Sequence, residues 1–128
     1  MRTIKFRGKS CSNGDWFYGN LYDYDKDGRT HICGLERGCL NIDPNTVGQF
    51  TGLLDKNGKE IYEGDVIKGK YHTTHLIQYN EKEASFFAYS LPISESSFRG
   101  HFYQNWINEF DKVVIGNIHD NPELMKEK

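Results

Sequence analysis

The sequence predicts a mainly β protein, built as a small β-barrel or roll, and three observations support this. About seven short segments rich in β-branched and aromatic residues recur along the 128-residue chain, separated by Gly, Asn and Asp turn signals. No long amphipathic helices alternate with these segments, as a parallel α/β sheet would require. Aromatic residues make up 14% of the chain, so rings are expected to supply much of the buried surface.

The first 45 residues are expected to form an N-terminal β-hairpin region. Ile4 and Phe6 alternate with basic residues, which is the period-2 pattern of a half-buried strand. The segments WFYGNLYDY and RTHICGL flank the turn DKDG and predict a hairpin. Residues 34–46 are predicted to be irregular and to end at a domain boundary in Asp43-Pro44-Asn45.

The remaining residues, 46–128, are expected to form an SH3-like β-barrel. Leu91–Gly100 is Ser-rich and is predicted to be a long loop, whereas HFYQNWINEF is predicted to be a short helix because its rings recur at i, i+4 and i+8. The chain should end in a helical turn with Asn121 as N-cap and Pro122 at the first helical position. The strands expected in this region are QFTGLLD, KEIY, VIKGKY, HLIQYN, ASFFAYS and a buried VVIGNI.

Asn57-Gly58 predicts a hairpin whose register can be argued from charge. A two-residue turn would place Lys56 opposite Lys59, and like charges would then face each other. A type I turn with Gly58 in the left-handed position of a bulge instead pairs Asp55 with Lys59. We therefore predict the bulged form.

Two segments of the sequence resemble ligand-binding loops but depart from the required motif. Gly52 followed by Gly58-Lys59 resembles a phosphate-binding loop, but one residue too many intervenes and Glu60 stands where Ser or Thr is needed. Residues 23–28, DYDKDG, copy the first half of a calcium loop, but Gly34 occupies the twelfth position, where a bidentate Glu is required. We interpret both segments as hairpin turns.

The cysteines give no strong metal motif. Cys11, Cys33 and Cys39 form an odd set, and the chain starts without an apolar signal region, so a cytoplasmic location in a bacterial cell is expected. His31, Cys33 and Cys39 could hold zinc, but no Cys-x-x-Cys pair supports this. A buried Cys33 and an ordinary surface thiol are the favoured interpretation, and no metal or cofactor is expected.

Charge separates a basic arm from an acidic body. The formal net charge is −2, which argues against a surface that attracts nucleic acid or membranes as a whole, and no apolar run is long enough for a membrane span. Lys5, Arg7 and Lys9 would share one strand face near Trp16, residue types that suit phosphate contact and base stacking. These four residues, the basic arm, are a candidate nucleic-acid interface, although charged residues also protect edge strands from pairing.

A second candidate surface is the charged turn of the predicted hairpin. Charge runs of this kind are usually solvated turns, and abundant carboxylates alone do not make a catalytic site. Their density nevertheless makes this turn a candidate partner-binding surface. We call it the charged rim and define it as Asp55, Lys56, Lys59, Glu60 and Glu63.

Three segments together resemble the YopX family of phage and prophage proteins. They are TVGQFTGLLDKNGKEIYEGDVI, IGNIHDNPEL near the end, and KFRG followed by WFYG at the start. The resemblance implies a β-rich protein with an SH3-type C-terminal part, a setting in the host cytoplasm, and no assigned catalytic or binding residues.

Three functions remain open from the sequence. The leading one is a non-enzymatic accessory module that binds a host or phage macromolecule, because no catalytic motif is present and small barrels offer aromatic-lined grooves. The alternative is a small nucleic-acid-binding protein that uses the basic arm. The third is a metal-dependent hydrolase using Asp and Glu of the turns. Edge strands and surface aromatics also favour a homo-oligomer.

Overall fold

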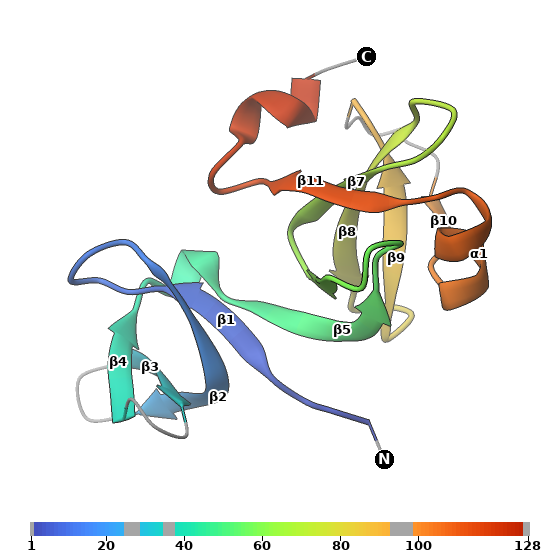
Figure 1. The fold of residues 1–128 in the computed structure, drawn as a ribbon. Helices are drawn as coiled ribbons and strands as arrows, with labels where there is room; N and C mark the ends of the chain where they lie inside the picture. The colour runs from blue at the N-terminus through green and yellow to red at the C-terminus, as the bar shows by residue number, and fades with distance from the viewer. Residues whose placement is uncertain (1, 25–28, 35–37, 93–98, 127–128) are drawn as a thin grey trace. The chain divides into compact units, whose positions relative to one another are not determined.

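The structure, a computed structural model, describes residues 2–24, 29–34, 38–92 and 99–126 (Figure 1). The chain divides into two compact units, Met1–Phe50 and Thr51–Lys128. Both are built mainly from antiparallel strands, as the sequence predicts. We describe each unit by itself.

The first unit is an antiparallel sheet with the strand order β4-β3-β2-β1. It contains β1 (Phe6–Lys9), β2 (Trp16–Tyr24), β3 (Arg29–Gly34) and β4 (Gly38–Ile42). The first residues of β5 (Gly48–Leu54) pair with β1. The predicted first strand and the β2–β3 hairpin are confirmed.

The prediction of an irregular segment over residues 34–46 is wrong. It contains β4, which pairs with β3 along its whole length, and the 3-10 helix η2 (Pro44–Thr46). The Asp43 side chain accepts a hydrogen bond from the Asn45 amide at the start of η2. The signal was missed because GCLNI is mostly exposed, so its sequence shows no apolar alternation.

Three residues form the buried core of the first unit. Phe17 from β2, Ile32 from β3 and Ile42 from β4 are 6%, 0% and 2% exposed. Strand alternation places one residue of each strand on the same face, and burial of each such side chain contributes about 1.5–3 kcal/mol. Partly buried side chains that pack against this core are Phe6, Leu21, Leu40 and Val47.

The second unit contains a five-stranded antiparallel sheet with the order β10-β9-β8-β7-β11 (Figure 1). Its strands are β7 (Asp65–Lys68), β8 (Thr74–Asn80), β9 (Ser85–Ser90), β10 (Arg99–His101) and β11 (Val113–Asn117). The rest of β5 pairs with β6 (Glu60–Tyr62). A short helix α1 (Gln104–Glu109) precedes β11, and the 3-10 helix η3 (Pro122–Lys126) follows it.

Several details of the second unit differ from the predictions. In the part of the chain that the structure describes, the five-stranded sheet is open, so the predicted closed barrel is not formed. Strand β11 is mostly half-buried and Ile115 is exposed, so the prediction of a buried strand is wrong. The short helix is confirmed as α1. Most of the predicted loop 91–100 lies outside the described residues, and β10 begins at Arg99.

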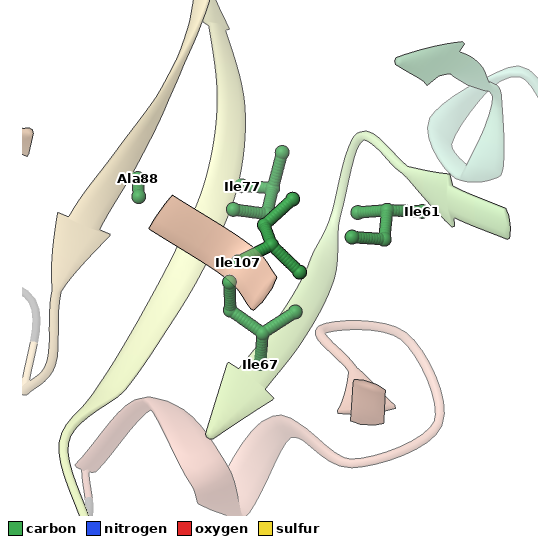
Figure 2. Packing of buried hydrophobic residues seen from close by; sticks show 5 residues of the cluster. All are labelled: Ile61, Ile67, Ile77, Ala88 and Ile107. Atoms are coloured by element: carbon green, nitrogen blue, oxygen red, sulfur yellow. The ribbon is translucent and has the colours of Figure 1, made fainter. Parts of the chain in front are cut away.

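The core of the second unit takes one residue from each of five elements. Ile61, Ile67, Ile77, Ala88 and Ile107 come from β6, β7, β8, β9 and α1, and all are fully buried (Figure 2). Because Ile107 belongs to this cluster, its burial fixes the two-turn helix against the sheet, although so short a helix is marginal alone. Trp106 and Val114 also pack against the cluster.

The hairpin between β5 and β6 has the predicted bulged register. The Gly58 amide donates to the Asp55 carbonyl at 3.0 Å, and the Asp55 amide donates to the Lys59 carbonyl at 2.7 Å. Gly58 has a φ of +85°, the left-handed conformation that glycine adopts at little cost. Asp55 therefore pairs with Lys59, and the two lysines are not placed opposite each other.

Candidate functional site

The second unit has a concave surface lined mainly by aromatic side chains. Its volume is about 420 Å³. Aromatic walls with a few convergent polar groups are typical of ligand sites. We call this surface the aromatic groove and define it by its lining residues Tyr71, Thr73, His75, Gly100, Tyr103, Trp106, Phe110 and Lys112.

One backbone hydrogen bond joins the turn between β7 and β8 to the end of α1, and another closes the turn itself. The Lys70 amide donates to the Phe110 carbonyl at 2.9 Å, and the Gly69 amide donates to the Thr73 carbonyl at 3.2 Å. His72, inside this turn, has a φ of +62°, which few residues other than glycine adopt. The turn therefore holds Tyr71 and Thr73 next to the residues that follow α1.

Lys112 is the buried polar residue of the aromatic groove, and it is only 3% exposed. Its stem lies over the backbone of Gly69, where a Cβ atom would stand 2.7 Å from Lys112 Cδ and equally close to the Phe110 carbonyl oxygen. Only glycine leaves room for this approach. The lysine stem is thereby directed between the β7–β8 turn and α1.

The Lys112 ammonium group contacts three neutral partners. Nζ donates to Thr73 Oγ1 at 2.9 Å and lies 3.5 Å from His75 Nδ1. It also lies 4.8 Å from the centroid of the Trp106 ring, in a cation–π contact. The Trp106 ring in turn meets the His75 ring edge to face at 5.2 Å.

Burial and the neighbouring charge change the ionisation of this cluster. Burial, with a further contribution from the Lys112 charge, lowers the pKa of His75 from 6.5 to about 4. His75 is therefore neutral at pH 7, and its Nδ1 atom can accept a hydrogen bond from the Lys112 ammonium group. Burial also lowers the pKa of Lys112 from its usual value.

The cluster lacks a counter-charge within the described residues. No carboxylate of those residues lies within ion-pair distance of Lys112 Nζ, whereas exposed Lys56 pairs with Asp111 at 3.4 Å. A buried cation without an opposite charge is costly. The aromatic groove can therefore hold an anionic group.

The charged rim is only partly exposed. Asp55 is 5% exposed, and its carboxylate accepts from the backbone amides of Asn57, Lys59 and Val114 at 2.8, 2.9 and 3.0 Å. Our expectation of an exposed Asp55 is wrong because turn amides need acceptors, and this carboxylate supplies them. Of the other rim residues, Lys56 and Lys59 are exposed, and Glu60 and Glu63 are half-buried.

The charged rim also supports the segment that carries Lys112. The Lys56 amide donates to the Lys112 carbonyl at 2.9 Å, and Lys56 Nζ donates to the Asn108 carbonyl at 3.4 Å. Asp111, which pairs with Lys56, has a φ of +52°. The rim thus fixes the backbone on both sides of the buried lysine.

The basic arm is brought together only in part. The Arg7 guanidinium and Lys9 Nζ lie 4.6 and 5.4 Å from the centroid of the Trp16 ring, whereas Lys5 Nζ lies over Phe50 at 5.4 Å. Arg7 is 6% exposed, so the central residue of the predicted candidate nucleic-acid interface is buried. Cation–π contact with Trp16 explains why a charged residue occupies an inward position.

The cysteines are arranged differently from the prediction. Cys33 and Cys39 are cross-strand partners on β3 and β4 and form a disulfide, while Cys11 is free and exposed. Cys33 is half-buried rather than buried. The two paired sulfurs are not available as thiolate ligands for zinc in this state. A hollow of about 550 Å³ lies beside them, lined by Tyr22, His31 and the two cysteines.

Side chains that could bind a metal ion are not grouped together in the part of the chain that the structure describes. No group of three His, Cys, Asp or Glu side chains that could hold a metal ion occurs in residues 2–24, 29–34, 38–92 and 99–126. The last four of the six residues of the calcium-like segment, 25–28, lie outside the described residues.

Sequence reasoning missed the cluster of Thr73, His75 and Lys112. Thr73 and Lys112 are 39 positions apart, so no spacing motif joins them. One signal was available: strand alternation places Lys112 on the same face as Val114, which packs on the core. A lysine on the inward face at the start of an apolar strand predicts a buried cation.

Comparisons with known proteins give a family and a related solved structure. The model of the family described as YopX protein matches residues 5–126. None of the curated proteins matches this chain. The crystal structure of protein EF1440 from Enterococcus faecalis is similar, with a TM-score of 0.64 and 28% sequence identity over 98% of this chain and 100% of that chain. Within the residues described here, the helices are all too short or too polar to cross a membrane.

Proposed function

This chain belongs to the YopX family, and we propose that it is a non-enzymatic module that binds a macromolecular partner through the aromatic groove. The observation that carries the proposal is Lys112, a cation 3% exposed in an aromatic-walled surface and without a carboxylate partner in the described residues. On the basis of the family resemblance, the proposal also includes that this is a phage or prophage accessory protein and that it acts in the cytoplasm of a bacterial host.

Two exposed rings support a binding role for the groove. Tyr71 and Tyr103 are 68% and 52% exposed, and both line it. Exposed tyrosines that surround a desolvated centre are characteristic of protein interfaces, where a few aromatic anchors supply most of the binding energy. The rings have an apolar body and a polar end, so they suit a partner that carries both kinds of group.

The carboxylates of the turns support a non-enzymatic role. Asp55 accepts three backbone hydrogen bonds, and buried Asp65 accepts one from the Tyr62 amide at 2.8 Å. A general acid or base must reach a substrate proton, and these carboxylates accept from backbone amides of their own turns and, for Asp55, also of β11. Their geometry fits hairpin construction better than hydrolysis.

Affinity capture with matched variants tests this proposal. The tagged protein is used to capture partners from an extract of cells that carry the gene, with chemical cross-linking and quantitative mass spectrometry. We expect the double variant Tyr71→Ala, Tyr103→Ala to lose at least 90% of the captured partner, because truncating interface anchors costs about 2 kcal/mol or more each. Tyr79→Ala, which removes a 41% exposed ring from β8 outside the groove, should capture as much as the unaltered protein.

Two results would contradict the proposal. One is that no specific partner is recovered from the extract. The other is that both variants capture the same amount, which would place the interaction elsewhere on the protein. Circular dichroism spectra of the variants control for unfolding, since exposed side chains contribute little to stability.

A further inference from the structure

The ammonium group of Lys112 has donor capacity that its neighbours do not use. A protonated lysine offers three N–H donors. Thr73 Oγ1 and His75 Nδ1 accept two of them, and no third acceptor for Nζ is found among the described residues. The Trp106 ring lies beside the group and attracts the charge without accepting a conventional hydrogen bond.

Thr73 adds a second donor at the same place. Its hydroxyl oxygen accepts from Lys112, so the hydroxyl proton remains to be donated elsewhere. His75 cannot compete as a cation, because its Nδ1 atom faces the ammonium and must be unprotonated. An anionic group with two acceptor oxygens could therefore receive one hydrogen bond from Lys112 and one from Thr73.

We infer that the aromatic groove binds a polypeptide segment that presents one carboxylate beside an aromatic or aliphatic side chain, with the carboxylate on Lys112 and Thr73. The apolar side chain would lie against Tyr103, Trp106 and Phe110, which line the same surface. This inference rests on the proposed function and names the chemistry of its ligand.

The charge of the second unit favours a single carboxylate over a nucleic acid. Residues 51–128 carry 9 basic and 12 acidic side chains, so this unit is net negative. A nucleic acid brings one phosphate per nucleotide and needs several basic contacts to offset the repulsion. One carboxylate requires one buried cation, and the groove provides one in Lys112.

Small probes can test this directly on the full chain. N-acetylphenylalanine carries a carboxylate beside an aromatic ring, and N-acetylphenylalanine amide is its neutral counterpart of the same shape. Binding is followed by nuclear magnetic resonance at pH 7.5 and low salt. We expect the acid to bind with a Kd of about 1 mM, as suits so small a ligand, and the amide at least tenfold more weakly.

Two lysine variants locate the effect. Lys112→Met removes the charge but keeps the length of the side chain, and replacing a buried charge by an apolar residue often leaves stability unchanged or raised. This variant should bind acid and amide equally. Lys82→Met removes an exposed lysine of the same unit that does not line the groove, and it should keep the full preference for the acid.

Three results would overturn the inference. They are equal binding of acid and amide by the unaltered protein, a preference for the acid that survives in Lys112→Met, and binding of an oligothymidylate through Lys112 more tightly than the acid. The last result would indicate a phosphate ligand. If any of them occurs while capture still depends on Tyr71 and Tyr103, only the carboxylate inference fails. Loss of that capture would overturn the proposed function instead.

Discussion

Replacing His75 with Asn should make the second unit less sensitive to mild acid. Burial and the nearby Lys112 charge hold the pKa of His75 near 4 in the folded protein, against 6.5 for an unperturbed histidine. Between these values the unfolded chain binds a proton that the folded chain does not, so the free energy of unfolding falls as the pH falls. This contribution to stability is complete above pH 6.5 and is lost as the pH drops toward 4.

The size of the effect follows from the difference between the two pKa values. Integrating the proton linkage from pH 7.5 to pH 5 gives a loss of about 2 kcal/mol, because the unfolded histidine is almost fully charged at pH 5 and the folded one is almost neutral. Asn in place of His75 cannot titrate, and its side-chain oxygen can accept from Lys112 as Nδ1 does. The variant should therefore lose about 2 kcal/mol less over this pH range.

Urea unfolding at several pH values measures this difference. In a Trp16→Phe background, Trp106 is the remaining tryptophan and its fluorescence reports the second unit. His72→Asn is a matched control because His72 is exposed, and Asn tolerates its left-handed backbone conformation. Groups that all three proteins share contribute equally to the pH dependence and cancel in the comparison. Identical pH dependence in His75→Asn and in the His72→Asn control would refute the argument.

Three further predictions concern stability. Asp55→Ala should lower the free energy of unfolding of the second unit by about 3 kcal/mol in urea titrations, because three backbone amides lose a charged acceptor. A loss below about 1 kcal/mol would contradict this role of Asp55. Gly58→Val should lower the melting temperature clearly, since valine is strained at a φ of +85°. Its control, Lys59→Ala, should change stability by no more than about 0.5 kcal/mol, and equal melting temperatures of the two variants would contradict the bulged turn. Reduction of the Cys33–Cys39 disulfide should destabilise the first unit by about 2 kcal/mol, the loop-entropy value for a separation of 6 residues. Alkylation without reductant should label Cys11 alone, and labelling of all three cysteines would show that the disulfide does not form.

Much of the fold could be predicted because its strands carry local signals. The β2–β3 hairpin, the bulged turn at Gly58 and helix α1 follow from alternation, from charge opposition and from ring spacing. Strand β4 could not be predicted, because its side chains are mostly exposed and pairing with β3 alone makes it a strand. The strand order of the open sheet in the second unit depends on pairing between strands that are distant in sequence, such as β7 and β11, and turn signals do not specify such pairing.

The candidate site was less predictable than the fold. Burial of Arg7 depends on Trp16, which lies on the neighbouring strand β2, and burial of Lys112 depends on the close approach allowed by Gly69. Both are charged side chains, and this residue type is rarely buried in proteins. Tertiary contacts with aromatic rings reverse that expectation, and the sequence alone does not show which ring meets which cation.

The segment TVGQFTGLLDKNGKEIYEGDVI, which contributes to the family resemblance, also has a structural role in the second unit. Leu54 exchanges hydrogen bonds with the Gln104 side chain at 3.1 and 2.7 Å, Asp55 accepts from the Val114 amide, and Lys56 donates to the Lys112 carbonyl. Three consecutive residues of the hairpin thus hold the start of α1 and the start of β11. Trp106 belongs to α1 and Lys112 directly precedes β11, so the hairpin fixes both walls of the aromatic groove. Asp55 and Lys56, two of the charged residues of this turn, are therefore better explained as the support of a binding surface than as the surface itself.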